Sequence, residues 1–219
     1  MTSGIVLVSI ALIAFFIYVS VSHQRYRDPG EAADARNVEE FGEPAKSLYT
    51  SSKVFTLHHL IEITDAEDKL VYRSETKFPS IHDKTDIYTA DERHIAHVES
   101  KLISFHEIHY VDMDNGRSFT LSNEIMHIIK DVTNIEGLGW RLDGNILQLN
   151  FTLADENGEL IAVVSQKLIS LHDKYSVDIY KPEYEEEVVA ILVTLQHMVN
   201  DREVASSAGS SGGSSSGSN

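Results

Sequence analysis

The sequence predicts a mainly β protein: an antiparallel barrel of about twelve strands that encloses an apolar C-terminal helix, preceded by an N-terminal transmembrane helix. Three observations lead to this class. An uncharged apolar run opens the chain, short segments of alternating polarity separated by turn signals fill its middle, and one strongly apolar stretch lies near its end. With 219 residues, the chain has room for one medium domain besides its terminal segments.

The first 24 residues have the length and composition of a membrane anchor. No charged residue precedes Arg25, and the apolar stretch covers residues 4–22. A helix of this length spans roughly 28 Å, close to the hydrocarbon thickness of a bilayer. A cleaved signal peptide would show a basic leader and a small-residue cleavage site, so an uncleaved anchor is favoured over that alternative and over a buried soluble helix. The residues expected in the bilayer are Ile5, Val6, Leu7, Leu12, Phe15, Phe16 and Ile17.

The two arginines that follow the anchor predict its orientation. Arg25 and Arg27 are the basic residues nearest to the span, and both lie on its C-terminal side. Positive charge is retained on the cytoplasmic side of membranes. The sequence therefore predicts a single-pass protein of the cell membrane, with its β domain in the cytoplasm.

Two segments frame the predicted domain at residues 46–205. Residues 25–45 are acidic and contain Pro29, Gly30, Gly42 and Pro44, which predicts a linker that holds the domain off the membrane. Residues 206–219 consist almost entirely of Ser and Gly, which predicts a flexible coil and resembles an engineered linker or tag scar.

The middle of the chain is a succession of short alternating segments. Asp114-Asn115-Gly116, Asp143-Gly144 and Glu156-Asn157-Gly158 have the composition of hairpin turns, because these residue types accept positive φ at low cost. Ten to twelve strands fit in this space. The pattern predicts an antiparallel barrel or sandwich rather than alternating strands and helices.

A repeated motif supports a meander of strands. The pattern K-x-x-[ST]-x-H occurs at residues 53–58, 77–82, 101–106 and 167–172, with the first three copies 24 residues apart. Alternating segments flank the copies. We expect each copy to span the end of a strand and the turn after it.

One predicted helix follows Pro182. Four glutamates at its start complement the positive end of the helix dipole, and the next residues are apolar on every face. The run is short for a membrane span, so a core helix enclosed by the sheet is favoured over a second membrane contact. The predicted core residues are Val188, Val189, Ile191, Leu192, Leu195 and Val199.

Composition excludes several functions. The net charge is −16, with 34 acidic and 18 basic residues, which argues against nucleic acid as a partner and against adhesion of the domain to anionic lipid. The chain has no cysteine, which excludes disulfides, thiolate zinc sites and cysteine nucleophiles. No nucleophile elbow and no phosphate-binding glycine loop occurs in the sequence.

Eleven histidines raise the question of a metal site. Residues three apart point to opposite faces of a regular strand, which argues against chelation by His94 with His97 or by His106 with His109. Structural roles are favoured for the repeated histidines, although a cluster of them would titrate near neutral pH. These are His58, His82, His106 and His172. Asp112, Asp114 and Gly116 have the spacing that opens a calcium loop, but Asn123 stands where the terminal glutamate is needed, so a hairpin turn is expected.

The ordered motifs resemble the LURP-one-related family, including its small bacterial YxjI-type members, within the tubby C-terminal-like barrels. The resemblance rests on the repeated K-[LF]-x-S-[LIF] elements, the stretch at residues 139–144, the hairpin at residues 155–162 and the acidic start of the final helix. It covers about residues 47–203 and implies a closed barrel around the helix. Phospholipid scramblases resemble it in fold but carry cysteine-rich and metal-associated features, and tubby domains bind phosphoinositides through basic residues that have no counterpart cluster here.

Together these features predict a membrane-anchored, non-enzymatic domain without cofactor or metal that binds a protein or a lipid-like partner. Phospholipid binding or scrambling is the alternative. A hydrolase that uses His82, His106 and His172 with acidic residues is a second alternative.

Overall fold

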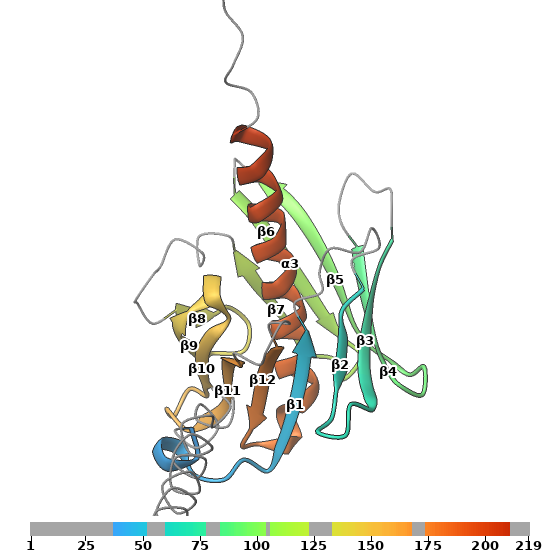
Figure 1. Ribbon diagram of the computed structural model, residues 1–219. Helices are drawn as coiled ribbons and strands as arrows, with labels where there is room; N and C mark the ends of the chain where they lie inside the picture. Colours follow the sequence, from blue (N-terminus) through green and yellow to red (C-terminus); the bar gives the residue numbers. More distant parts are fainter. Residues whose placement is uncertain are drawn as a thin grey trace, which may run out of the picture.

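The computed structural model describes residues 37–51, 60–77, 84–103, 106–122, 133–167 and 174–210, which form one antiparallel sheet curled around a long helix (Figure 1). The strands are β1 (Lys46–Ser51), β2 (Glu62–Thr64), β3 (Leu70–Lys77), β4 (Lys84–Thr89), β5 (His94–Ile103), β6 (His106–Met113), β7 (Ser118–Ser122), β8 (Thr133–Ile135), β9 (Trp140–Asn145), β10 (Asn150–Ala154), β11 (Leu160–Lys167) and β12 (Lys174–Ile179). The helices are η2 (Ile146–Gln148), η3 (Pro182–Tyr184) and α3 (Glu185–Ser210), and residues 37–41 are also helical.

The sheet is a nearly closed barrel. Its twelve strands follow the order β7-β6-β5-β4-β3-β2-β1-β12-β11-β10-β9-β8, and neighbouring strands are antiparallel. β1 pairs with β12 from Lys46 opposite Ile179 onward, which joins the two halves of the chain. The seam between β7 and β8 is bridged where the Thr120 N–H donates to the Glu136 carbonyl oxygen at 3.0 Å. The predicted many-stranded antiparallel barrel is confirmed.

Gly137 permits the seam to close. Its φ is +99°, and a Cβ at this position would lie 2.5 Å from the carbonyl oxygen of Ser118 and 2.9 Å from the Cα of Phe119. A side chain at residue 137 would therefore push β7 away from the turn that follows β8.

One predicted hairpin turn is wrong. Asp143 and Gly144 lie inside β9, and the connection to β10 is made by η2 with Leu149 in the left-handed region at φ +46°. A Cβ on Gly144 would approach the Phe151 Cα to 2.7 Å, so the glycine serves close strand approach rather than a turn. The turns predicted at residues 114–116 and 156–158 are confirmed, with Gly116 and Gly158 at positive φ.

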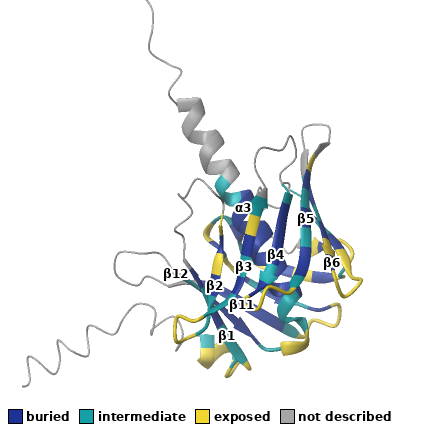
Figure 2. Ribbon diagram, turned by 90° about the vertical axis from the view of Figure 1, so that its right-hand side faces the viewer, coloured by how far each residue is buried: buried dark blue, intermediate teal, exposed yellow. Residues whose placement is uncertain are grey.

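The first part of α3, up to Met198, occupies the interior of the barrel (Figure 2). Five of the predicted core residues are fully buried, namely Val188, Val189, Ile191, Leu192 and Leu195, and Val199 is half-buried. Because the wall surrounds the helix, an apolar residue is accommodated on every helix face. α3 continues to Ser210, so the segment predicted as a coil from residue 206 begins within the helix. Backbone hydrogen bonding extends readily from a helix that is already formed.

The barrel has two distinct ends. At one end lie the turns after β2, β4, β6, β8 and β10, and α3 begins there; we call it the helix-start rim. The opposite end, the helix-exit rim, receives the ends of β1, β3, β5 and β11, so the strand ends that flank all four K-x-x-[ST]-x-H copies meet at one rim. Residues 58, 82 and 172 lie outside the described residues, and His106 opens β6.

The wall changes character along the barrel axis. In the half of the barrel wall nearer the helix-start rim, the inward side chains are apolar, as at Leu48, Ile87 and Val111. At the next inward position along a strand, nearer the helix-exit rim, the buried side chains include polar ones such as Thr50 and His109. α3 shows a similar change, since buried polar residues appear among the apolar ones after residue 193, namely Thr194, Gln196 and His197.

The final part of the predicted linker is docked on the barrel. The Asn37 side-chain amide donates to Ser165 Oγ at 3.0 Å and to Asp178 Oδ2 at 3.4 Å, and the Ala45 N–H donates to the Ile179 carbonyl oxygen at 2.8 Å. Residues 37–45 are thus an arm on the outer face of β11 and β12 rather than a loose tether. Composition did not reveal this, because the arm is held by a few specific hydrogen bonds.

The predicted anchor, with Ile5 to Ile17 and the topology residues Arg25 and Arg27, lies outside the described residues. Among the residues that are described, α3 included, no helix combines the length and the hydropathy that a membrane crossing requires.

Candidate functional site

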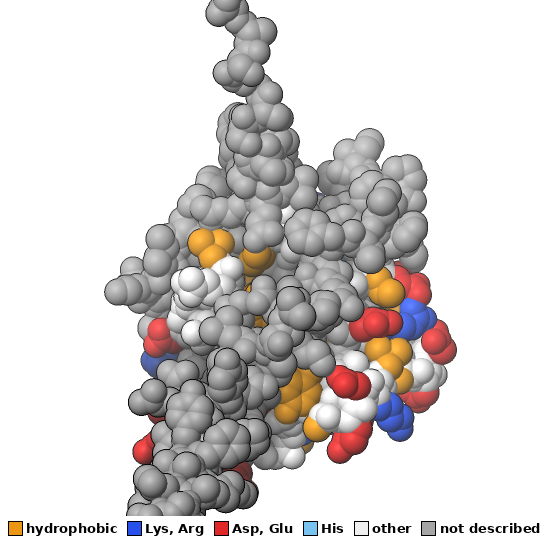
Figure 3. All heavy atoms as spheres, in the orientation of Figure 1, with side chains coloured by type: hydrophobic (Ala, Val, Ile, Leu, Met, Phe, Trp, Pro, Cys, Tyr) orange, Lys and Arg blue, Asp and Glu red, His pale blue; other side chains and the backbone are white. Residues whose placement is uncertain are grey.

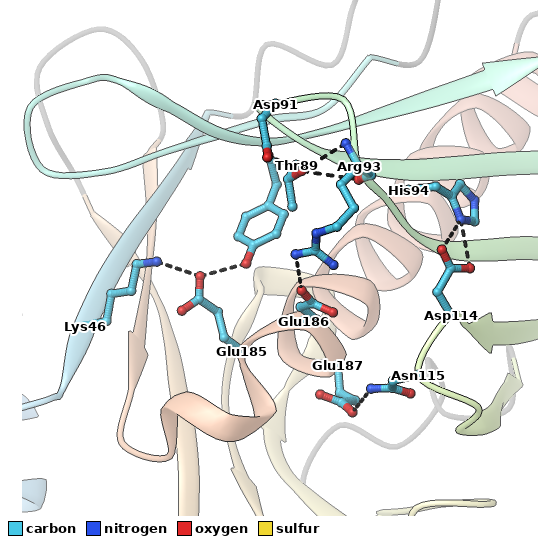
Figure 4. Close-up of polar contacts among 11 residues, drawn as sticks. Lys46, Thr89, Asp91, Arg93, His94, Asp114, Asn115, Glu185, Glu186 and Glu187 are labelled. Atoms are coloured by element: carbon cyan, nitrogen blue, oxygen red, sulfur yellow. Dashed lines mark hydrogen bonds and ion pairs between the residues drawn. The ribbon is translucent and has the colours of Figure 1, made fainter.

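The helix-start rim is held together by carboxylates at the beginning of α3 (Figure 4). Glu185 accepts from Lys46 Nζ at 2.6 Å and from the Tyr72 hydroxyl at 2.8 Å, and Glu186 accepts from Arg93 at 2.6 Å. Burial, reinforced by the Glu185 carboxylate, raises the pKa of Tyr72 well above its usual range. The hydroxyl therefore stays protonated and donates to Glu185.

Glu187 is the buried member of this group. Its side chain is 1% exposed, and it accepts from Arg117 Nη1 and from Asn115 Nδ2, each at 2.8 Å. A buried carboxylate is tolerated when it is paired and hydrogen-bonded, and both donors come from the turn between β6 and β7. This contact therefore fixes Arg117 at the rim, where its own side chain remains 45% exposed.

A pocket of about 450 Å³ opens at this rim. Its lining comes from η3, from the turns after β6, β8 and β10 and from the first residues of β7 and β9. The residues used below are Arg117, Gly137, Trp140, Asp155, Glu156 and Tyr184. We call it the helix-start pocket. Its volume falls in the range of sites for small molecules or single side-chain groups.

Two aromatic rings form the inner wall of the pocket. Trp140 and Tyr184 pack edge to face with centroids 5.0 Å apart, and Trp140 is 5% exposed. The Arg117 guanidinium lies over the other ring, with Cζ 5.0 Å from the Tyr184 centroid. The stacking and the bond to Glu187 together limit the positions that Arg117 can take.

The turn between β10 and β11 forms the acidic flank. Asp155 Oδ1 accepts from the N–H groups of Asn157 and Glu159, both at 2.9 Å, and Oδ2 accepts from Lys181 Nζ at 2.6 Å. The Lys181 ammonium holds the pKa of Asp155 below its usual range, and Asp155 with Glu159 raises the pKa of Lys181. Asp155 thus shapes the turn that carries Glu156.

Arg117 and Glu156 lie on opposite sides of the turn after β8. In the sheet, the turn that holds Gly137 separates the β6–β7 turn from the β10–β11 turn. Glu156 is exposed, and its carboxylate has no hydrogen bond or ion pair with another residue that the structure describes. The pocket therefore has one cationic flank and one anionic flank with aromatic rings between them.

The surroundings of Asp155 do not favour a role as a general base. A general base works best with a pKa near the working pH, whereas the Asp155 pKa is held low. The part of the chain that the structure describes contributes no histidine to the pocket lining.

The geometry predicted for His94 and His97 is wrong. A β-bulge pairs Ile87 with Ala96 but Tyr88 with His94, so both histidines reach one carboxylate. His97 Nδ1 lies 2.6 Å from Asp86 Oδ1, and His94 Nε2 lies 3.5 Å from the same atom.

The other nitrogen of His94, Nδ1, lies 2.9 Å from Asp114. Asp114 thus belongs to the predicted hairpin turn, and its contact with His94 was not predicted. Across the described ranges, no three metal-binding side chains are grouped so that they could hold an ion.

The sequence reasoning missed the pocket. Arg117, Glu156 and Tyr184 come from separate turns and become neighbours only when the barrel closes. The available signal was Trp140, the single tryptophan, which follows two glycines at residues 137 and 139.

Comparisons with known proteins identify the family of this chain. The family model described as LURP-one-related matches residues 46–196, which is more than half of the chain. An uncharacterized Bacillus subtilis protein, YxjI, is 26% identical over 160 residues, covering 71% of this chain and 95% of its own length. A solved Arabidopsis thaliana structure aligns with a TM-score of 0.48 at 13% identity, covering 71% of this chain and 92% of that one. The chain belongs to the LURP-one-related family.

Proposed function

We propose that this protein is a membrane-tethered, non-enzymatic binding module whose partner engages the helix-start pocket at the cytoplasmic face. The observation that carries the proposal is the pocket itself. It joins an exposed arginine, a glutamate without a partner among the described residues and two aromatic rings on a rim that the first turn of α3 holds in place.

The surface outside the pocket supports a specific site rather than general adhesion. Figure 3 shows acidic and basic side chains interspersed on the described face at the right of the view. Ion pairs such as Lys84 with Glu99 at 3.3 Å neutralise charge locally. Exposed pairs of this kind contribute little binding energy, so recognition depends on shape and on a few fixed groups.

The membrane tether in this proposal rests on the sequence. The apolar run at residues 4–22 and the arginines at 25 and 27 place the domain beside the cytoplasmic leaflet. The arm at residues 37–45 is docked on the barrel, so the domain begins at Asn37 rather than at residue 46.

Site-directed crosslinking tests the proposal. The chain has no cysteine, so one introduced cysteine carries a photocrosslinker at a unique position. Asn157→Cys places the probe on the pocket lining, and Glu62→Cys places it on an exposed position of β2 as the control. In native membranes we expect a discrete adduct from position 157 and none from position 62.

Three outcomes would reject the proposal. Equal adducts at both positions would mean that the pocket is not the binding surface, and a chain that is extracted from membranes by alkaline carbonate would not be anchored. Labelling of the position-62 cysteine by a membrane-impermeant maleimide in intact cells would place the domain outside.

A further inference from the structure

We propose that the helix-start pocket binds a zwitterionic group, a cationic ammonium joined to a carboxylate or phosphate, through Glu156 on one flank and Arg117 on the other. This inference rests on the proposed function and specifies the chemistry of the partner group. Two opposite charges border one cavity without bonding to each other, and a dipolar ligand satisfies both at once.

Arg117 is prepared for an anion. A guanidinium has five N–H donors, and among the described acceptors only Glu187 receives one of them, from Nη1. Nearly half of the side chain is exposed, while its position is set by the buried Glu187 and by stacking on Tyr184. A fixed and partly unused guanidinium favours carboxylate or phosphate oxygens.

Glu156 is prepared for a cation. The neighbouring Asp155 directs both of its oxygens to the turn and to Lys181, whereas the Glu156 carboxylate has no partner within the described chain. Gly139 lies beside Glu156, since a Cβ built on this glycine would be in van der Waals contact with Glu156 Oε2 at 3.9 Å. An ammonium at this position would have a carboxylate on one side and the rings of the inner wall on another.

The size of the pocket agrees with a headgroup rather than a whole lipid. About 450 Å³ accommodates a molecule such as phosphoethanolamine or a dipeptide, but not an acyl chain as well. Free zwitterions and the headgroup of phosphatidylethanolamine share this chemistry, and experiment separates the two sources.

Trp140 gives a direct measurement. It is the single tryptophan and lines the pocket, so its fluorescence in the full chain in micelles reports occupancy. We expect a saturable change on titration with phosphoethanolamine. Glu156→Gln and Arg117→Gln should each weaken binding about tenfold, because each removes one charge-assisted contact. The binding of inorganic phosphate should be weakened only by Arg117→Gln, and the binding of ethylamine only by Glu156→Gln.

Matched variants control for general charge effects and for folding. Glu62→Gln and Arg141→Gln change exposed residues outside the pocket lining and should leave the titration unchanged. Since Arg117 also contacts Glu187, the Glu156 variants provide a test that leaves this contact in place, and Glu156→Lys should abolish the response to the ammonium.

Nanodiscs distinguish the source of the ligand. A shift of Trp140 emission in phosphatidylethanolamine discs but not in phosphatidylglycerol discs would support a lipid headgroup, and a response to free phosphoethanolamine alone would support a soluble zwitterion. Phosphoethanolamine that binds no more tightly than phosphate, or binding unaffected by both pocket variants, would overturn the inference. A crosslink from position 157 would still uphold the proposed function in that case.

Discussion

Arg117 donates a 2.8 Å hydrogen bond to the buried carboxylate of Glu187, which ties the β6–β7 turn to the first turn of α3. The bond serves two purposes. It neutralises a charge inside the barrel end, and it holds one flank of the helix-start pocket in position.

Replacing Arg117 with Met should lower the free energy of unfolding by about 3 kcal/mol, because the Glu187 charge remains buried with only Asn115 as donor. Arg93→Met is the matched control. Its pair with Glu186 is more exposed, so the loss should stay below about 1 kcal/mol. Denaturant unfolding measures the free energy of unfolding of both variants. Equal losses would contradict the distinction between a buried and an exposed ion pair.

His109 should make stability depend on pH. Burial lowers its pKa to about 4 from an ordinary value of 6.5. Above pH 6.5 the imidazole is neutral in both states, but between pH 6.5 and 4 the unfolded chain takes up a proton that the folded chain does not. Stability should therefore fall by about 3 kcal/mol across this window as the pH drops. In His109→Met this loss of stability between pH 6.5 and 4 should disappear. Urea titrations at several pH values measure it, and an unchanged loss in the variant would show that other groups cause the pH dependence.

Gly137 and Gly158 form a matched pair for the barrel seam. Both have positive φ, but a Cβ on Gly158 meets nothing within 4 Å, whereas one on Gly137 meets backbone at 2.5 Å. Gly158→Ala should cost about 1 kcal/mol from backbone strain alone. Gly137→Ala should cost several times more and should speed hydrogen exchange at the Thr120 amide, which bridges the seam. Similar costs for the two variants would show that the seam relaxes freely.

The arm should be released by Asn37→Ala. This variant removes the side-chain bonds to Ser165 and Asp178, so exchange of the Gly42 amide should accelerate while the melting temperature hardly changes. Glu39→Ala, an exposed change in the same helical turn, should leave exchange at Gly42 as it was. A large drop in melting temperature for Asn37→Ala would instead make the arm part of the global fold.

The local sequence pattern was sufficient to predict most of the barrel. Alternation of polarity and turn glycines are properties of neighbouring residues, so strand number, the turns at Gly116 and Gly158 and the apolar stretch at Val188–Leu195 could be predicted. The prediction failed at Gly144, where the glycine allows two strands to lie close together instead of forming a turn. It also failed at His94 and His97, where a β-bulge interrupts the alternation of side chains along the strand.

The pocket was beyond such reasoning for a different reason. Arg117 and Glu156 are far apart in the chain, and their relation depends on which strands become neighbours when the sheet closes. Nothing in the local sequence around Glu156 distinguishes it from the many other surface glutamates.

The position of α3 has a consequence for biosynthesis. The element that fills the barrel follows β12 in the chain, and β1 finds its partner β12 only after more than one hundred further residues have been translated. Until then the apolar inner faces of the earlier strands have nothing to cover them. Closure of the barrel should therefore wait until β12 and α3 have been translated, and it should be slow for a domain of this size because it pairs strands that are far apart in the chain.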